Sequence, residues 1–254
     1  AVGSDGALGA ASGGLTFAGG GLRADGAFSS TRAITMNAGG GTIDTQAHSV
    51  TLSGSLTGSG ALAKAGSGTL TFSGDGSAYT GTLTNRAGTL AIDGSLGGSV
   101  TSQGSLLTVG GAVAGDVTVG AGTATIGAPG RIGGDLFATG SATVRLDGTV
   151  TGNADIASGA RLSGIGRIGG DLILAGTFAP GNSVGAISVG GNATFAAGSV
   201  FDLELDADGI LDRTPSNGAG SIFNLVRMRN GIEEILAQVP GKYEPGQDTK
   251  LRVE

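Results

Sequence analysis

Short runs in which apolar and small polar residues alternate recur along most of this chain. They include GTLTFSG at 68–74, GTLAIDG at 88–94 and DVTVGAGTATI at 116–126. An alternation of period two is typical of a β-strand with one buried and one solvated side. Glycines flank the runs, and glycine is the usual residue where a turn requires positive φ. The pattern therefore predicts an all-β chain of short strands joined by glycine turns.

Many of these strands belong to a repeat of about 18 residues. Its signature is a heptad, Gly-x-apolar-x-Gly-(Ser/Asp/Asn)-apolar, and a weaker echo, VGGNA, follows at 189–193. One heptad, GRIGGDL, occurs letter for letter at 130–136 and again at 166–172, two repeats apart. The successive heptads begin at Gly94, Gly111, Gly130, Gly148 and Gly166.

The length of the repeat selects an architecture. A propeller blade or a helical repeat needs roughly 33 to 50 residues, whereas a unit of about 18 suits one turn of a parallel β-helix. Stacked turns pair their strands about 4.8 Å apart and close a continuous core. We therefore expect a right-handed parallel β-helix over residues 1–209, with rungs of about 18 residues over 94–209. The length allows roughly eleven or twelve turns and a rod about 50 to 60 Å long.

Composition supports this interpretation and excludes several classes of protein. The 54 glycines follow no three-residue period and only 5 prolines accompany them, which excludes collagen, while a 39% hydrophobic content argues against disorder. A net charge of −6 offers no basic footprint for nucleic acid. No apolar run reaches 18 residues, so we expect a chain that is not itself membrane-embedded. No signal peptide precedes the repeats, which predicts a mature product or an excised piece.

One polar residue recurs after the second glycine of the repeat. We interpret this series as a turn ladder, in which short side chains bond local backbone N–H groups at each corner. The alternative is a stack of metal ligands along one edge of the rod. Calcium-binding repeats need tandem Gly-Gly-x-Gly-x-Asp units, which the chain lacks, so the ladder is favoured. The series comprises Ser99, Asp116, Asp135, Asn153, Asp171 and Asn192.

The stretch 54–93, GSLTGSGALAKAGSGTLTFSGDGSAYTGTLTNRAGTLAID, resembles the passenger-associated transport repeat of bacterial autotransporters. Residues 31–45 look like the preceding rung of such a passenger, and 176–209 look like its last rungs. The resemblance therefore covers about 31–209. The positions that match the motif are Gly58, Gly60, Leu62, Lys64, Gly66, Gly68, Thr69, Leu70, Ser73, Gly74, Tyr79, Thr80, Gly81, Thr82, Gly88, Thr89 and Leu90.

The resemblance implies a route of export as well as a fold. Passengers of this class use type V secretion: they cross the outer membrane of a Gram-negative bacterium through, or alongside, a β-barrel translocator of the same precursor. They then fold rung by rung outside the cell and stay at the cell surface or are secreted, often as virulence factors. No barrel sequence follows in this chain, so the resemblance predicts a passenger without its C-terminal barrel. The absence of Cys fits, because no disulfide can form in the periplasm and block export.

Residues 210–254 depart from the repeat, with fewer glycines and more basic residues. Here SIFNLVRM (221–228) favours a strand and GIEEILAQV (231–239) favours a short amphipathic helix. The segment KYEPGQDTKLRVE (242–254) faintly resembles a strand of the passenger region that assists folding. We interpret 210–254 as a C-terminal cap or junction segment that closes the rod. The alternative is a truncation or a foreign junction.

Candidates for chemistry are few, and we expect no cofactor and no catalytic residue. His48 is the only imidazole, and its turn-like context indicates a structural, exposed histidine; Asp44 is near it only in sequence. Glycine-rich loops lack the Lys and following helix that a phosphate site requires. An alternating acidic row could bind Ca²⁺, but more often such a row is a solvated face that discourages edge pairing. That row consists of Asp202, Glu204, Asp206 and Asp208.

Three functions remain open at this stage. The first is a non-enzymatic surface passenger that acts as an adhesin, aggregation factor or spacer, with a host-surface or self-association partner. The second is a stalk whose active module lies N-terminal to residue 1. The third is a β-helix enzyme that degrades polysaccharides, which would require clustered charges and aromatic platforms that the sequence does not display. Fold alone cannot choose among them.

Overall fold

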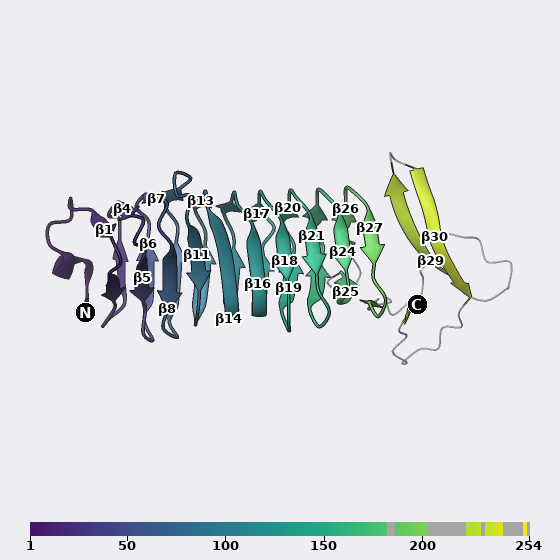
Figure 1. Cartoon of the computed structure of the whole chain (residues 1–254), viewed down its shortest axis with the longest axis horizontal. Coiled ribbons are helices and arrows are strands. Elements are labelled where there is room, and N and C mark those ends of the chain that lie inside the picture. Colours follow the sequence, from purple (N-terminus) through teal and green to yellow (C-terminus); the bar gives the residue numbers. More distant parts are fainter. Residues whose placement is uncertain (182–185, 203–221, 230–231, 241–250, 253–254) are drawn as a thin grey trace.

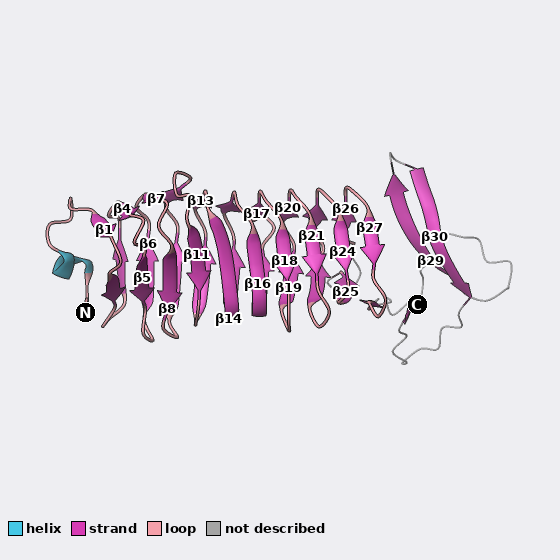
Figure 2. Cartoon of the chain, viewed as in Figure 1, coloured by secondary structure: helices cyan, strands magenta, loops and turns pink. Residues whose placement is uncertain are grey.

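The computed structural model describes residues 1–181, 186–202, 222–229, 232–240 and 251–252, with side chains for the first two ranges. Over these two ranges the chain winds into a parallel β-solenoid of about 10 turns, and each turn adds its strands beside those of the turn before (Figure 1). The described part holds one short helical turn, the 3₁₀ helix η1 (Asp5–Leu8), and is otherwise strands and turns (Figure 2). The predicted all-β parallel β-helix is confirmed.

Each turn contributes strands to three faces of the rod. The first face is formed by β2 (Gly21–Arg23), β5 (Gly41–Asp44), β8 (Leu62–Ala65), β11 (Thr82–Asn85), the starts of β14 (Ser99–Val109) and β16 (Val117–Ile126), β18 (Leu136–Ala138), β21 (Ala154–Ile156), β24 (Leu172–Leu174) and β27 (Ala193–Phe195). The second face is formed by β3 (Phe28–Ser30), β6 (Ser49–Leu52), β9 (Thr69–Phe72), β12 (Thr89–Ile92), the ends of β14 and β16, β19 (Thr143–Leu146), β22 (Arg161–Gly164), β25 (Thr177–Pro180) and β28 (Val200–Phe201).

The third face carries the heptads of the sequence repeat. It is formed by β10 (Asp75–Gly76), β13 (Ser95–Leu96), β15 (Ala112–Val113), β17 (Arg131–Ile132), β20 (Thr149–Val150), β23 (Arg167–Ile168) and β26 (Ser188–Val189). A separate three-stranded sheet lies in the N-terminal turns: β1 (Leu15–Phe17), β4 (Ile34–Met36) and β7 (Leu56–Gly58). All these pairings are parallel, so each residue has its counterpart in the next turn at the same height of the strand.

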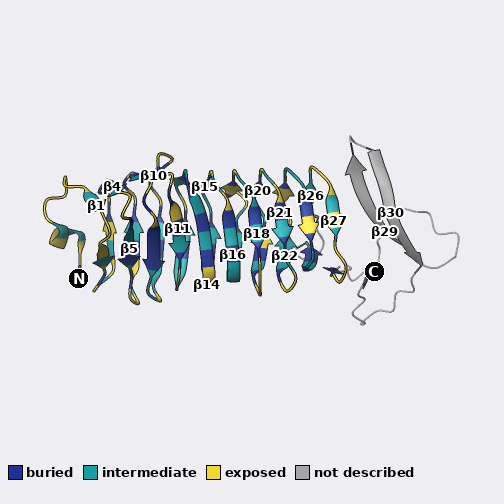
Figure 3. Cartoon of the chain, in the orientation of Figure 1, coloured by how far each residue is buried: buried dark blue, intermediate teal, exposed yellow. Residues whose placement is uncertain are grey.

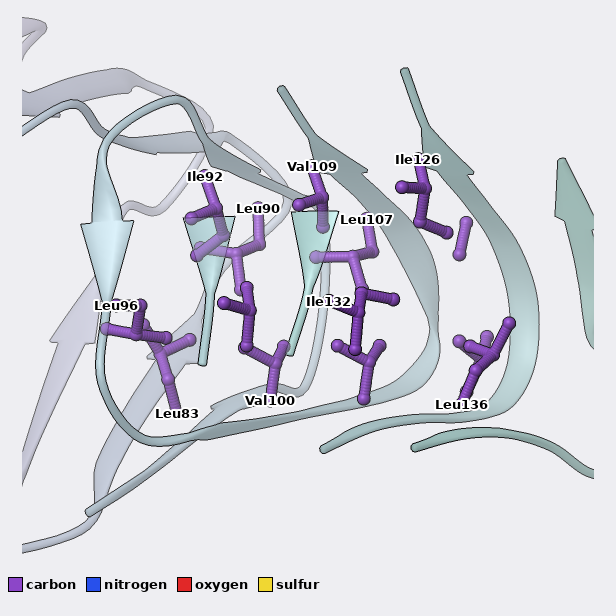
Figure 4. Close-up of a cluster of buried hydrophobic side chains, with 14 of the residues drawn as sticks. Leu83, Leu90, Ile92, Leu96, Val100, Leu107, Val109, Ile126, Ile132 and Leu136 are labelled. Atoms are coloured by element: carbon purple, nitrogen blue, oxygen red, sulfur yellow. The ribbon is translucent and has the colours of Figure 1, made fainter. Parts of the chain in front are cut away.

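The core is a set of columns of aliphatic side chains that run along the rod. Along the strands the burial alternates, with one side chain in the core and the next at the surface (Figure 3). On the second face Leu70, Leu90 and Leu107 are register partners and are all buried. Figure 4 shows Leu90 and Leu107 beside apolar side chains of neighbouring strands inside the rod. Each turn therefore buries its apolar side chains against those of its own other strands and against the turns before and after it.

The turns are longer near the N-terminus than the repeat of 18 predicts. Val50 pairs with Leu70 and Leu70 with Leu90, a step of 20 residues each time, whereas Leu162 follows Val144 by 18. Longer turns consume more chain, so the rod has about 10 turns instead of the expected eleven or twelve. The repeat was visible from Gly94 onward because the third-face steps from Ser95 to Arg167 are 17 to 19 residues; the next step, from Arg167 to Ser188, is 21.

An N-terminal arm folds against the first turn and is held there by one buried arginine. The Arg32 guanidinium, whose side chain is 1% exposed, donates to Asp5 Oδ1 at 2.9 Å and to Asp5 Oδ2 at 3.2 Å. It also donates to the carbonyls of Asp5, Gly9, Ala10 and Gly13. These bonds tie the arm, which includes η1, to the loop that precedes β4. The side-chain hydrogen bond from Arg32 lowers the pKa of Asp5 below its usual 3.8.

The C-terminal segment contains an antiparallel hairpin. β29 (Ile222–Arg229) pairs with β30 (Ile232–Pro240), so the strand prediction for the first is confirmed and the helix predicted at 231–239 is wrong. The apolar positions Ile235, Ala237 and Val239 also alternate with period two, and pairing with a neighbouring strand overrides a weak helical preference. β31 (Leu251–Arg252) pairs antiparallel with β28. Most of 242–254 lies outside the described residues.

We expect Arg32→Met to loosen the N-terminal arm and to destabilise the rod by about 3 kcal/mol, because the Asp5 carboxylate and four carbonyls of the arm lose their shared donor. Hydrogen exchange at residues 1–14 and urea unfolding measure the two effects. Arg23→Met is the matched control, since Arg23 and its partner Asp25 are both exposed. The same unfolding free energy for both variants would contradict a clamping role for Arg32.

Candidate functional site

The polar residue of the repeat forms a continuous hydrogen-bonded ladder along one corner of the rod. Asp116 Oδ1 accepts from the backbone N–H of Asp135 at 2.9 Å, and Asp135 Oδ1 accepts from that of Asn153 at 2.6 Å. Every member from the first to the last is linked to its successor in this way. The other three bonds join Ser99 Oγ to Asp116 N (3.1 Å), Asn153 Oδ1 to Asp171 N (2.8 Å) and Asp171 Oδ1 to Asn192 N (2.6 Å).

The predicted ladder is therefore present, but the donors differ from those expected. The sequence suggested that each side chain bonds the backbone of its own corner. Instead each oxygen accepts the backbone N–H of the equivalent residue in the next turn. The ladder joins turns to one another, and it satisfies one N–H per turn that no strand pairing reaches. Within the described residues no group of three His, Cys, Asp or Glu side chains is placed to hold a metal ion.

The glycine before each ladder residue is required by the same geometry. At Gly152 a Cβ atom would overlap Asp135 Oδ1, and at Gly170 it would overlap Asn153 Oδ1. Gly115, Gly134 and Gly191 meet the side-chain oxygen of the previous turn in the same way, whereas Gly98, before the first member, meets the carbonyl oxygen of Gly81. The two residues of the Gly-(Asp/Asn) pair therefore act together: the glycine leaves the space that the side-chain oxygen of the preceding turn occupies.

The residues that match the transport-repeat motif are mostly placed where turns stack. Leu62, Leu70 and Leu90 are buried in the core, and Thr69 and Thr89 are outward register partners. Gly66 and Gly88 take φ of +82° and +68°, a conformation that other residues adopt at a cost. A Cβ at Gly60, Gly68, Gly74 or Gly81 would overlap a backbone carbonyl oxygen of the preceding turn. These positions of the motif therefore serve the packing of one turn on the next.

Lys64 is the most unusual member of the motif because it points into the core. Its side chain is fully buried, and Nζ donates to the carbonyl oxygens of Gly66 (2.6 Å), Gly68 (2.7 Å) and Ala87 (2.6 Å). Three carbonyls match the three donors of an ammonium group. Burial lowers the pKa of Lys64 from 10.5 to about 8. Ala87 belongs to the next turn, so the lysine links two turns. It does so at the corner where Gly66 and Gly88 adopt positive φ.

Tyr79 is a second polar anchor of the same motif. Its ring is buried in the core, and its hydroxyl lies 2.9 Å from Gly60 O and 3.0 Å from Thr82 O. Burial raises the pKa of the Tyr79 hydroxyl to about 12. The tyrosine therefore fixes the corner ahead of β11 to the turn before it.

Three buried polar residues were missed by sequence reasoning. Arg32 stands in a polar run that gave no sign of burial. Asn85 and Ser102 are register partners of the Lys64 column and are fully buried, and Asn85 Nδ2 donates to Leu106 O at 3.0 Å. The available signal was the strand alternation, which places both on the inward side, but Asn and Ser there look like surface residues.

His48 does not take part in a catalytic arrangement with Asp44. Both Asp44 carboxylate oxygens accept from Gln46, through its backbone N–H at 2.9 Å and through its side-chain amide. His48 is half-buried, not exposed as expected, in the turn that leads to β6, where its backbone bonds Thr45 and Thr69.

The acidic row at the end of the rod is only partly described. Asp202 accepts from Arg161 Nη1 at 2.8 Å, which gives its carboxylate a cation from two turns earlier in the rod. Glu204, Asp206 and Asp208 lie outside the described residues, so the calcium interpretation stays a prediction.

Comparison of the chain with protein-family models, with curated proteins and with solved structures found no match. In the part of the chain that the structure describes, no helix is long and apolar enough to span a membrane.

We expect Gly152→Ala to destabilise the rod by about 2 kcal/mol, because the new Cβ meets Asp135 Oδ1 and can be accommodated only by a shift of the turn. Equilibrium unfolding in urea measures the loss. Gly20→Ala is the control, since nothing lies within 4 Å of a Cβ there and φ is not positive. In the double variant Asp135→Ala/Gly152→Ala part of the cost is recovered. Equal stability of both single variants would refute the steric role of the ladder.

We expect Lys64→Met to destabilise the rod by about 2 kcal/mol at pH 7, because three carbonyls lose their donor. The exposed Arg86→Met serves as the control for loss of a positive charge. The effect depends on pH, because the folded chain releases the Lys64 proton near pH 8 and the unfolded chain near 10.5. Stability of the unsubstituted chain relative to Lys64→Met therefore rises with pH between these values. Urea unfolding at pH 7 and pH 10 checks this, and a flat difference would contradict it.

Proposed function

We propose that this chain is the rod of a non-enzymatic surface passenger of the autotransporter type, which acts as an adhesin, an aggregation factor or a structural stalk. It reaches the exterior of a Gram-negative cell through the β-barrel translocator of its precursor and folds there turn by turn. The observation that carries the proposal is the turn-to-turn construction, in which ladder oxygens, Lys64 and the parallel strands all bond the neighbouring turn. The resemblance of residues 54–93 to the transport repeat supplies the link to secretion.

The construction suits folding that follows export. In a solenoid each turn contacts only its neighbours, so an emerging turn can fold on the one already outside without waiting for distant parts of the chain. The chain has no Cys, so nothing can crosslink it before it crosses. Small side chains and glycine corners add no bulky obstacle to threading.

The non-enzymatic part of the proposal rests on the roles already taken by the chemically capable side chains. Lys64 is enclosed by carbonyls, Asp44 is occupied by Gln46 and the ladder oxygens bond backbone N–H groups. The outward rows consist mainly of Thr, Ser and Ala, which suit broad contact with another surface better than bond cleavage.

The proposal is tested by fusing the chain between a periplasmic export signal and an outer-membrane β-barrel translocator, and by measuring its accessibility to antibody on intact cells. We expect display of the unmodified rod. Thr101→Cys/Thr118→Cys places two cysteines on register partners of the first face, about 4.8 Å apart. A disulfide formed in the periplasm then closes a loop, and surface display falls several-fold.

Each single cysteine variant is the control and is displayed normally, and a strain without periplasmic disulfide formation restores display of the double variant. Failure of the unmodified rod to reach the surface would sink the export proposal. Sedimentation of the same cells separates the two roles: an adhesin or aggregation factor makes displaying cells settle faster than cells with the barrel alone, whereas a stalk does not.

A further inference from the structure

The repeated heptad GRIGGDL places two arginines on the third face, two turns apart. Arg131 in β17 is the register partner of Thr149 in β20, which in turn is the partner of Arg167 in β23. With strands about 4.8 Å apart, the two Cα atoms are separated by roughly 9.6 Å along the rod. Packing does not explain the arginines, because both side chains are exposed while their neighbours Ile132 and Ile168 fill the core.

From Ser95 to Ser188 the outward row carries no other charge, and its remaining side chains are short. The outward row continues with Ser95 and Ala112 on one side and Ser188 on the other. The next outward position of each turn is small, with Gly133, Thr151, Gly169 and Gly190 in the four turns concerned. Arg167 Nη2 lies 3.5 Å from the point where Gly190 would carry a Cβ, so its guanidinium extends over bare backbone of the next turn.

Both guanidinium groups are available to a ligand. The ion pairs among the described residues involve Arg23, Arg32, Arg145 and Arg161, and neither Arg131 nor Arg167 is among them. A guanidinium group recognises a carboxylate or a sulfate through paired N–H donors, and it is weakly hydrated.

We propose that the third face binds a linear acidic polysaccharide, laid along the rod with one carboxylate or sulfate on each arginine and the Thr149 hydroxyl between them. The argument is charge complementarity together with spacing: a polymer with one acidic group per disaccharide presents its charges at an interval close to two turns. Nucleic acid has phosphates at a much closer interval and needs a denser row of cations. The inference rests on the proposed surface role, for which it names the class of partner.

The ladder carboxylates limit how the polymer lies. Asp135 and Asp171 follow the arginines by four residues, at the corner beyond the glycines, and Asp147 is paired with Arg145 at 2.6 Å. An acidic chain is therefore confined to the arginine row and kept away from the corner. The contacts per rod are few, so the binding is weak and salt-sensitive, and many rods on one surface strengthen it by avidity.

The test is titration of the purified rod with hyaluronan and with heparin at low ionic strength, with dextran as the neutral polymer. We expect binding of an acidic polymer and none of dextran, and a log–log slope of affinity against salt of about −2. Hyaluronan and heparin distinguish carboxylate from sulfate as the preferred group. For Arg131→Ala/Arg167→Ala we expect an affinity about tenfold lower and a slope near zero.

Two further variants separate position from net charge. Arg23→Ala/Arg86→Ala removes the same charge from exposed sites elsewhere and should change the affinity less than about twofold. Arg131→Ala/Thr149→Arg keeps two arginines on the face but in adjacent turns, and should bind as weakly as the double alanine variant. All these sites are exposed or half-buried, so the melting temperature checks that each variant stays folded.

Several outcomes would overturn the proposal: no binding of either acidic polymer at low salt, equal loss in the charge control, or an oligothymidylate bound as tightly as hyaluronan. These are distinguishable from failure of the surface role. Cells that display the rod and still aggregate without any acidic-polymer binding would retain the proposed function and lose only this partner.

Discussion

The spacing of adjacent parallel strands governs almost everything else in this rod. Because successive turns are about 4.8 Å apart, a tight corner has space for the backbone and one hydrogen bond to the next turn, but not for a larger side chain. At Gly152 the space of a Cβ is taken by a ladder oxygen, and at Gly60, Gly74 and Gly81 by a carbonyl of the turn before. The high glycine content thus reflects contact between corners, and only a minority of these glycines adopt positive φ.

The same spacing turns single residues into columns. A residue type that fits one turn fits the next, so Leu70, Leu90 and Leu107 stack in the core, and Asp and Asn succeed each other along the corner. The two buried cations each have several hydrogen-bond partners. Lys64 donates to three carbonyl oxygens from two turns. Arg32 donates to the Asp5 carboxylate and to carbonyl oxygens of the N-terminal arm. Where a turn cannot rely on a like neighbour, as at the first turn, a charged clamp replaces stacking.

The sequence predicted the features that repeat from turn to turn, but not the buried polar residues that occur once. Period-two runs and the recurring heptad were enough to infer the parallel solenoid and the corner ladder, because those features repeat. The register partners of the ladder side chains were not foreseen, since a bond to the next turn is indistinguishable in sequence from a bond within the corner. The burial of Arg32, Asn85 and Lys64 depends on contacts that each occur once in the rod. The strand Ile232–Pro240 depends on pairing with a neighbouring strand. Local patterns carry neither kind of information.

A rod built this way separates its stability from its surface. The inward side chains, the corner glycines and the ladder oxygens fix the stacking, and each is constrained by the turns on either side. The outward positions of the strands carry no such constraint, so Arg131 and Arg167 can differ from Ser95, Ala112 and Thr149 on the same row without disturbing the core. Residue types that recur at inward positions are therefore explained by core packing. Packing does not explain a residue type that recurs at an outward position, as arginine does in the two identical heptads. The interval between the two arginines is the strongest indication of what they bind.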